Sequence, residues 1–272
     1  MSCDSNNCAS CKSKGACGEI KKFLAKGGII KHIVGVVSGK GGVGKSTVTS
    51  LLASQMAKKG YKVGILDADI TGPSIPHSFG LNGKLDGDEN HLMLPKVSKG
   101  GIKIVSTNLV VDDPEQPVVW RGPILGNAVK QFYDSVKWGT LDYLYVDMPP
   151  GTSDVALTVF QSIPIDGIVL VTSPQELVTI VVEKAVNMAR KMNVNIIGLI
   201  ENMSYVKCPC CDQKIEIYGK SHLEEVCEKY HLVPLAKLPI DPKLTNLMDS
   251  GKIEEFDTSL LDVAISQIEM RR

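Results

Sequence analysis

The chain has 272 residues and a hydrophobic content of 43%, enough for a substantial core in one large domain or two small ones. Thirty lysines and arginines balance thirty aspartates and glutamates, so the chain lacks the positive charge of a non-specific nucleic-acid binder. No apolar run approaches membrane-spanning length, and residues 1–18 are polar instead of signal-like. We therefore expect a cytoplasmic protein that binds neither nucleic acid nor membrane.

Eight cysteines in a reducing compartment indicate metal or redox chemistry more than disulfides. The first cluster comprises Cys3, Cys8, Cys11 and Cys17. Few apolar residues separate these thiols, so residues 1–28 cannot pack a core and are expected to form a cysteine-rich extension and linker. Four thiolates suffice for one [4Fe–4S] cluster, which we favour, or for one tetrahedral zinc ion. Unligated thiols are the third alternative.

The strongest motif follows at residues 39–46, which fit the pattern G-x-x-x-x-G-K-[ST]. A β-branched run before the motif predicts a buried strand. The residues after it predict an amphipathic helix that ends near Gly60. A phosphate-binding loop needs this strand–loop–helix context, so we predict a nucleotide site here.

The nucleotide-binding candidates in this loop are contiguous: Gly39, Lys40, Gly41, Gly42, Val43, Gly44, Lys45, Ser46 and Thr47. Glycines lack a Cβ, so successive backbone N–H groups can turn toward phosphate oxygens, and the following helix adds its own free N–H groups. Lys45 is expected to bridge the β- and γ-phosphates. The Ser46 hydroxyl is expected to complete the ligand shell of a Mg²⁺ ion.

A second lysine in the loop, Lys40, carries a resemblance to a known superfamily. Lys-Gly-Gly-x-Gly-Lys-Ser-Thr resembles the deviant Walker A loop of the ATPases that include ParA and MinD, the nitrogenase iron protein and the Mrp/ApbC iron–sulfur carriers. The resemblance implies a nucleotide-sandwich homodimer in which Lys40 reaches a phosphate of the facing subunit. Lys40 and Lys45 are then both catalytic candidates.

The C-x₂-C-x₅-C part of the first cysteine cluster is similar to the N-terminal motif of the eukaryotic cytosolic iron–sulfur scaffold ATPases. That resemblance implies a second [4Fe–4S] cluster at the N-terminus. The gap between Cys3 and Cys8 is much shorter here than in that family.

Residues 62–67 predict a second buried strand that ends at Asp67, with Asp69 two positions later. A carboxylate at the carboxyl end of a strand lies on the ligand side of an open α/β sheet, and residues two apart share one face. Both carboxylates are therefore candidates for handling Mg²⁺ and water, and the resemblance implies that Asp69 orients the attacking water. The alternative is an aspartate that caps the next element.

Residues 141–147 predict a third strand, ending at Asp147 and followed by Met-Pro-Pro-Gly151. This arrangement matches a Walker B strand and a second switch. Asp147 is expected to hold Mg²⁺ through water, and Gly151 to offer an N–H to the γ-phosphate. The Asp-x-Pro-Pro-Gly sequence resembles the Mrp-type branch.

A strand predicted at residues 195–200 precedes Asn202. The resemblance implies that an asparagine at this position recognises the adenine edge. The guanine-recognition motif Asn-Lys-x-Asp does not occur in the sequence, which favours ATP over GTP.

The second cysteine cluster contains the pair Cys208 and Cys211 in a Cys-x-x-Cys arrangement. Two thiolates are half of what a [4Fe–4S] cluster or a zinc ion requires. A symmetric dimer would bring a second copy of the pair to the two-fold axis, and the resemblance to Mrp/ApbC carriers implies a bridging [4Fe–4S] cluster there. Cys210 is an additional thiol without an assigned role.

An internal zinc site with Cys227 and His231 is the alternative partner for this pair, since the spacing approaches that of a zinc finger. However, Ser221 and Glu224 fit a capping box that opens a helix with Cys227 on its apolar stripe. We therefore favour a buried core thiol for Cys227, and a helix-end position for His231.

Strands and helices alternate over nearly the whole chain, which predicts one α/β P-loop domain at residues 29–272, a mainly parallel sheet flanked by helices. The resemblance implies an ATP-hydrolysing homodimeric scaffold that binds a [4Fe–4S] cluster and transfers it to apo iron–sulfur proteins. One alternative is an ATP-gated electron donor like the nitrogenase iron protein, which uses separated cysteines instead of a Cys-x-x-Cys pair. The other is a cofactor-free MinD/ParA-like positioning ATPase, for which residues 260–272 are too short and too weakly basic a tail.

Overall fold

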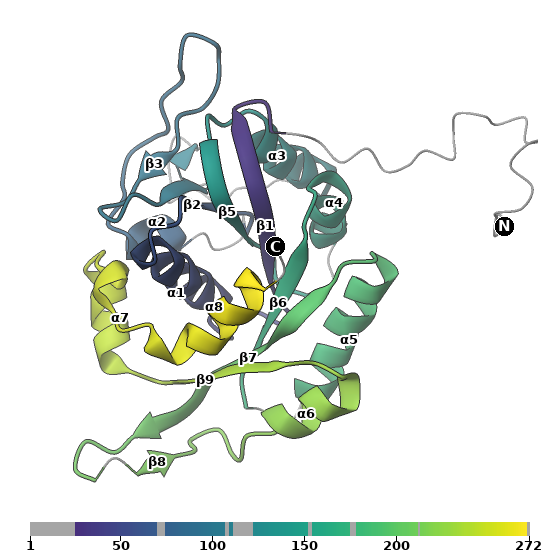
Figure 1. Cartoon of the computed structure of the whole chain (residues 1–272), viewed down its shortest axis with the longest axis vertical. Helices are drawn as coiled ribbons and strands as arrows, with labels where there is room; N and C mark the ends of the chain where they lie inside the picture. The colour runs from purple at the N-terminus through teal and green to yellow at the C-terminus, as the bar shows by residue number, and fades with distance from the viewer. Residues whose placement is uncertain are drawn as a thin grey trace, which may run out of the picture.

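The structure is a computed structural model that describes residues 25–69, 74–106, 109–110, 122–151, 154–174, 178–211 and 213–270. Cys3, Cys8, Cys11 and Cys17 lie outside the described residues, so their metal site stays a prediction. Within the described part of the chain, nine strands form one sheet in the order β3-β4-β2-β5-β1-β6-β7-β8, and β9 pairs with β7 (Figure 1).

Most strand pairs in this sheet are parallel; β3–β4 and β7–β8 are antiparallel. The strands are β1 (Gly28–Ser38), β2 (Val63–Asp67), β3 (Lys96–Val97), β4 (Lys103–Ser106), β5 (Gly139–Asp147), β6 (Gly167–Thr172), β7 (Ile196–Lys207), β8 (Lys214–Ile215) and β9 (Pro234–Pro239). The predicted mainly parallel sheet is confirmed.

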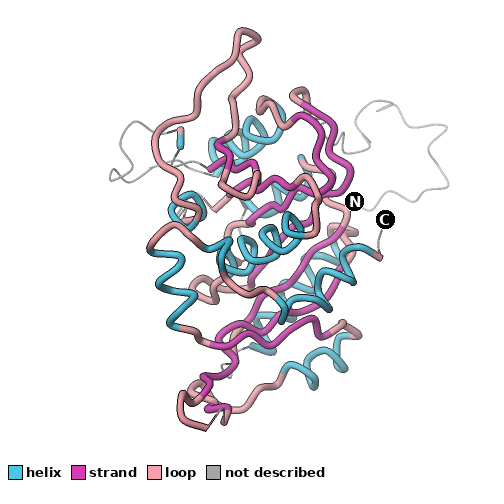
Figure 2. Tube along the Cα trace, turned by 60° about the vertical axis from the view of Figure 1, so that its left-hand side comes forward, coloured by secondary structure: helices cyan, strands magenta, loops and turns pink. Residues whose placement is uncertain are grey.

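Helices cover both faces of the sheet, as the turned view of Figure 2 shows. They are α1 (Lys45–Lys58), α2 (Ile75–Ser78), α3 (Gly122–Asp134), α4 (Asp154–Ser162), α5 (Val178–Lys191), α6 (Leu223–Tyr230), α7 (Pro242–Asp249) and α8 (Asp262–Glu269), with short 3-10 helices at Ile253–Glu255 and Ser259–Leu261. None of the helices in the described ranges has the length and apolar character that a membrane crossing requires.

The strands contribute side chains to two hydrophobic cores, because successive side chains of a strand point to opposite faces of the sheet. In β6, Ile168 and Leu170 pack in the core that contains side chains of α3, α4, α5 and α6. Val169 and Val171, which alternate with them, pack in the core that contains α1 and α8. A strand buried on both faces has an almost continuous apolar sequence, which explains why β1 and β5 were predictable.

The prediction for β7 was wrong at its carboxyl end. The strand does not stop near Ile200 but continues to Lys207, because its second half pairs with β8 and β9. Neither of these partner strands had been predicted. Local pattern could not reveal them, since β8 has only two residues and β9 both begins and ends with proline.

The start of α6 also differs from the prediction. The helix begins at Leu223 with His222 as its N-cap, whose side chain makes no capping hydrogen bond, and the Ser221 hydroxyl accepts one from the Leu223 N–H at 3.4 Å. Glu224 does not reach back to Ser221, because its carboxylate forms an ion pair with Lys237 Nζ at 2.7 Å. The tertiary ion pair thus takes the place of the Glu224 half of the predicted capping box.

Candidate functional site

The phosphate loop connects the end of β1 to the start of α1, as predicted. Gly42 and Gly44 have φ angles of 79° and 77°, in the left-handed region that favours glycine. A Cβ added to Gly41 or Gly42 would meet no heavy atom within 4 Å, so this side of the loop is open. An open, Cβ-free backbone ahead of a helix N-terminus fits phosphate oxygens.

Asp147 is the centre of a buried polar cluster behind this loop. Its side chain is 0% exposed, and its Oδ2 accepts hydrogen bonds from Lys45 Nζ at 2.7 Å and from Ser46 Oγ at 2.6 Å. Its Oδ1 accepts a hydrogen bond from Thr49 Oγ1 at 2.7 Å. Sequence reasoning missed Thr49, although it lies one helical turn after Lys45 and therefore on the same face of α1.

Lys45 lies between two carboxylates. Its side chain is only 5% exposed, and its Nζ is 2.7 Å from Asp147 Oδ2 and 3.5 Å from Asp69 Oδ2. Asp69 is the more accessible of the two carboxylates, with a side chain 14% exposed. The structure therefore brings together Lys45, Ser46, Asp69 and Asp147, which the sequence had placed in three separate motifs.

Asp67 lies beside Asp147, because the two residues are in register on the parallel strands β2 and β5. Its Oδ2 accepts a hydrogen bond from Ser106 Oγ at 3.0 Å, and its Oδ1 accepts one from the Asp69 N–H at 3.2 Å. Burial, followed by the charge of Asp147, raises the pKa of Asp67 to about 8. Ser106 ends β4, a strand that the sequence analysis had not predicted.

Gly151 and Asn202 each donate a hydrogen bond to a backbone carbonyl, the first just before the phosphate loop and the second within it. The Gly151 N–H donates to the Ser38 carbonyl at 2.8 Å, so contact with a γ-phosphate would require this bond to open. The Asn202 side chain is buried, and its Nδ2 donates to the Val43 carbonyl at 2.9 Å. The predicted contacts of Gly151 with phosphate and of Asn202 with adenine stay predictions.

The side chains around the loop fit a magnesium nucleotide. Hydroxyl and carboxylate oxygens are the ligands that Mg²⁺ prefers, and Ser46 Oγ and Asp147 Oδ2 lie 2.6 Å apart behind the loop. A bound Mg²⁺ would neutralise phosphate charge. The loop backbone and Lys45 are the groups that would hold the phosphates, and Lys40 is half-buried in the same loop.

The second cysteine cluster lies in the turn between β7 and β8, which we call the cysteine hairpin (residues 206–215). Figure 1 shows this hairpin projecting from the body of the molecule. The Cys208 N–H donates to the Gln213 carbonyl at 2.9 Å, whereas Cys210 and Cys211 are exposed. Hydrogen bonds from the Cys210 backbone and from the Cys211 thiol lower the pKa of Cys208. A lowered pKa favours the thiolate, the form that binds metals.

Cys227 is a buried core thiol, as predicted. It is 3% exposed on the apolar stripe of α6, and burial raises its pKa to about 11. His231 caps the end of α6 with a φ of 57°. In the described ranges, no group of three or more His, Cys, Asp or Glu side chains is arranged to hold a metal ion.

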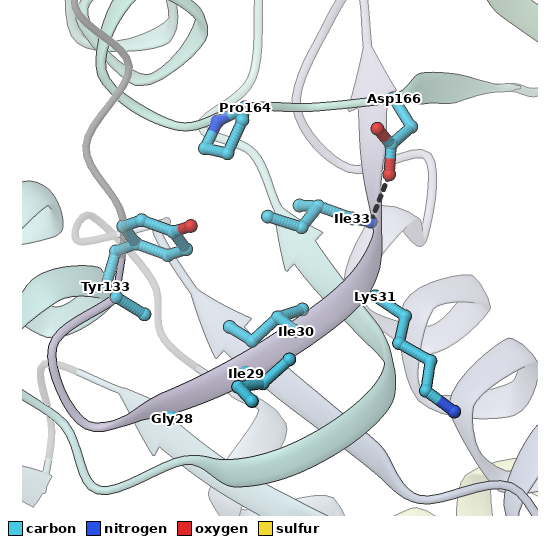
Figure 3. Close-up of a pocket in the computed structure, with 9 residues that line it drawn as sticks. Gly28, Ile29, Ile30, Lys31, Ile33, Tyr133, Pro164 and Asp166 are labelled. Carbon is cyan, nitrogen blue, oxygen red and sulfur yellow. Dashed lines mark hydrogen bonds between the residues drawn. The ribbon is translucent and has the colours of Figure 1, made fainter.

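A separate hollow of about 380 Å³ lies at the amino end of β1. Figure 3 shows it between β1, Tyr133 and Pro164, with Asp166 Oδ2 accepting a hydrogen bond of 2.8 Å from the Ile33 N–H. Because β1 has 11 residues and spans roughly 35 Å, this hollow and the phosphate loop lie at opposite ends of the strand. The hollow is not part of the nucleotide site.

Comparison with known families decides the classification of the chain. The family described as "ParA: NUBPL iron-transfer P-loop NTPase" matches residues 29–270. The chain belongs to this family. The predicted superfamily is therefore confirmed.

Several relatives of this iron-transfer P-loop NTPase have similar lengths. The iron-sulfur cluster carrier protein of Clostridium perfringens is 44% identical over 268 residues, which cover 92% of this chain and 94% of that protein. The carrier protein of the same name from Methanocaldococcus jannaschii is 43% identical over 258 residues, covering 92% and 89%. The cytosolic Fe-S cluster assembly factor CFD1 of Kluyveromyces lactis is 42% identical over 241 residues, covering 86% and 84%.

Solved structures agree with this classification. A nucleotide-binding protein from Archaeoglobus fulgidus, in complex with ADP, has a TM-score of 0.75 and 42% identity to the iron-transfer P-loop NTPase described here. The similarity covers 84% of this chain and 89% of that one. The cell division ATPase MinD of Pyrococcus furiosus has a TM-score of 0.62 over 89% of this chain and 99% of its own, at 21% identity. At that identity the likeness to MinD shows the fold alone.

Proposed function

We propose that this iron-transfer P-loop NTPase binds and hydrolyses ATP with Mg²⁺ in the cytoplasm, and uses it to control a [4Fe–4S] cluster that it passes to apo iron–sulfur proteins. The observation that carries the proposal is the presence, in one chain, of an assembled phosphate-loop site and an exposed Cys-x-x-Cys hairpin. The names of the carrier and assembly-factor relatives support it.

In the nucleotide half of this function, Lys45 holds the β- and γ-phosphates, and Ser46 and Asp147 hold Mg²⁺. Asp69 orients the attacking water, which its position beside Lys45 and its partial exposure support. Lys40 completes the site of a facing copy of the chain, so hydrolysis requires a homodimer. The Archaeoglobus relative was solved in complex with ADP, which supports nucleotide binding by this chain.

In the cluster half, Cys208 and Cys211 of two copies supply the four thiolates of one bridging cluster. An isologous interface duplicates whatever lies on the two-fold axis, so two half-sites become one site. The hydrogen bonds that favour a thiolate at Cys208 support its role as a ligand. Cys227 has no part in this site, since it is buried in the core of its own chain.

Anaerobic purification with counting of iron and acid-labile sulfide tests the cluster half. The double variant Cys208→Ala, Cys211→Ala is expected to lose the bridging cluster. The matched control Cys210→Ala, in the same turn, is expected to keep it. Removal of residues 1–24 separates iron bound at the N-terminal cysteines from iron at the hairpin. Full iron content in the double variant, or zinc without sulfide in every sample, would contradict the proposal.

Phosphate release from ATP tests the nucleotide half. Asp69→Asn keeps the size of the side chain but removes the carboxylate that orients water, so we expect kcat to fall by about 100-fold or more. Asp86→Asn is the matched control, because the Asp86 side chain is 80% exposed and remote from the loop. Equal turnover in the two variants would remove Asp69 from the mechanism.

A further inference from the structure

The strand β7 connects the phosphate loop to the cysteine hairpin. Asn202, near its middle, contacts the loop, and Cys208 follows its last residue, Lys207. Six positions of one chain therefore separate a residue that touches the nucleotide site from a residue of the metal-binding pair. A segment this short can transmit a displacement if it is packed at the loop end and held by backbone hydrogen bonds at the hairpin end.

The contact at the loop end of this segment is close and buried. Asn202 is 5% exposed, and its Nδ2 donates to the Val43 carbonyl at 2.9 Å. A Cβ at Gly44 would lie 2.2 Å from Asn202 Nδ2 and 3.6 Å from Met203 Cε. The loop backbone at Gly44 thus rests directly on these two side chains, with no room for even a methyl group.

Between the two ends, β7 contains a bulge (residues 202–204). Four residue steps of β7, from Glu201 to Tyr205, span only two steps of β9. Met203 in the bulge has a φ of 57°, which costs energy for a residue with a Cβ. The bulge is closed by a hydrogen bond of 2.6 Å from the buried Ser204 hydroxyl to the Glu201 carboxylate. Bulges near active sites commonly aim one side chain at a functional group, as Asn202 is aimed here.

Beyond the bulge, backbone hydrogen bonds lead into the cysteine hairpin. The Ile240 N–H donates to the Tyr205 carbonyl at 2.8 Å, and Lys207 pairs with Lys214 of β8. The next residue, Cys208, donates its N–H to the Gln213 carbonyl. Any shift of the strand at Tyr205 therefore moves the backbone that holds Cys208.

From these contacts we propose that Asn202 is a positioning residue that couples the nucleotide state of the phosphate loop to the cysteine hairpin through the bulge in β7. This inference rests on the proposed function. When phosphates bind the loop N–H groups, the Val43 carbonyl shifts. Asn202 moves with it because its Nδ2 is hydrogen-bonded to that carbonyl. The strained bulge is the element that changes between two arrangements, and the hairpin turn carries the change to Cys208 and Cys211.

The test is the rate at which iodoacetamide alkylates the hairpin thiols in the metal-free chain, measured by mass spectrometry with no nucleotide and with saturating Mg²⁺ and a non-hydrolysable ATP analogue. In the unsubstituted chain the nucleotide is expected to change this rate by about fivefold or more. In Asn202→Asp, which keeps the side-chain size but places an oxygen against the Val43 carbonyl, the change is expected to disappear. Nucleotide affinity is measured separately for each variant, so that every sample is saturated.

Asn195→Asp is the matched control, because Asn195 is exposed and lies just before the other end of β7. In Asn195→Asp, the nucleotide is expected to change the alkylation rate of the hairpin thiols as much as it does in the unsubstituted chain. If Asn202→Asp does not fold, Ser204→Ala replaces it: this change opens the bulge without touching the loop and is expected to reduce the response at least by half. A response that persists in the bulge variants, or that is absent from the unsubstituted chain, overturns the proposal.

These outcomes are separate from those of the proposed function. The alkylation experiment uses the metal-free chain, whereas the carrier function is judged from iron and sulfide content. A chain that binds the cluster but shows no nucleotide response would keep its function and lose the coupling. A chain that shows the response but never holds iron with sulfide would lose the carrier function instead.

Discussion

The phosphate-loop site and the cysteine hairpin of this chain differ in how complete they are. At the loop, Asp147 is 0% exposed, and a lysine, a serine and a threonine of the same chain satisfy it. At the hairpin, Cys210 and Cys211 are exposed, and the pair Cys208–Cys211 supplies two thiolates. The comparison teaches that burial at the carboxyl ends of parallel strands prearranges the phosphate-loop site. In the proposed function, the cysteine hairpin depends instead on a second pair of thiolates from another chain.

The largest expected effect comes from breaking the buried site. Lys45→Ala leaves Asp147 buried without its counter-charge, so we expect a loss of about 3–5 kcal/mol in the free energy of unfolding and loss of ATP binding. Urea unfolding measures the first and nucleotide titration the second. Lys26→Ala is the control: it removes a lysine that is 70% exposed and paired with Asp134, so a loss under about 1 kcal/mol is expected. Similar losses for both variants would mean that the loop site is not prearranged by burial.

The contrast between exposed and buried thiols is expected to be nearly as large. Cys227, with a pKa of about 11, is a thiolate in about one molecule in a thousand at pH 8. The pKa of Cys208 is lowered and its turn is accessible, so alkylation at Cys208 should be at least about 100-fold faster in the metal-free chain. Residue-resolved mass spectrometry measures both rates. Comparable rates would show that the two thiols have similar environments.

A smaller effect is expected at Thr49, which supports Asp147 from α1. Thr49→Val keeps the volume of the side chain but removes the hydrogen bond to Asp147 Oδ1, at a cost of about 1–3 kcal/mol in unfolding free energy. The Mg²⁺ concentration needed for half-maximal ATP hydrolysis should rise about tenfold. Thr49→Ser retains the hydroxyl and should recover most of both losses. If the serine variant behaves like the valine variant, packing and not the hydrogen bond supports Asp147.

The smallest expected effect is the pH dependence that Asp67 causes. Its pKa of about 8 means that the folded chain holds this proton more tightly than the unfolded chain. Stability of the nucleotide-free chain should therefore fall as pH rises from about 4 to about 8, by about 1 kcal/mol or more between pH 6 and pH 8. Asp67→Asn should remove this loss. Asp88→Asn should not alter it, because backbone hydrogen bonds lower the pKa of Asp88 and keep it ionised throughout this range. Urea unfolding at the two pH values decides between these outcomes.

The residues that sequence reasoning missed share one property: their role depends on a partner from another element. Ser106 contacts Asp67 because β4 lies beside β2, and no pattern in residues 103–106 predicts that β2 is the neighbouring strand. Thr49 was closer to detection, since its spacing from Lys45 places both on one face of α1. The orientation of Asn202 toward Val43 requires the bulge in β7, which arises from pairing with the unpredicted strand β9.

By itself, the sequence determined the phosphate loop, the carboxylates that end β2 and β5, the Cys-x-x-Cys pair and the apolar stripe that buries Cys227. These are short-range patterns, in which neighbouring residues set strand, turn and helix. Only the tertiary structure decided which of these groups meet: Lys45 and Asp147 are 102 positions apart, and Asn202 and Val43 are 159 apart. Such contacts follow from the order and register of parallel strands, which depend on how whole elements pack and not on any local pattern.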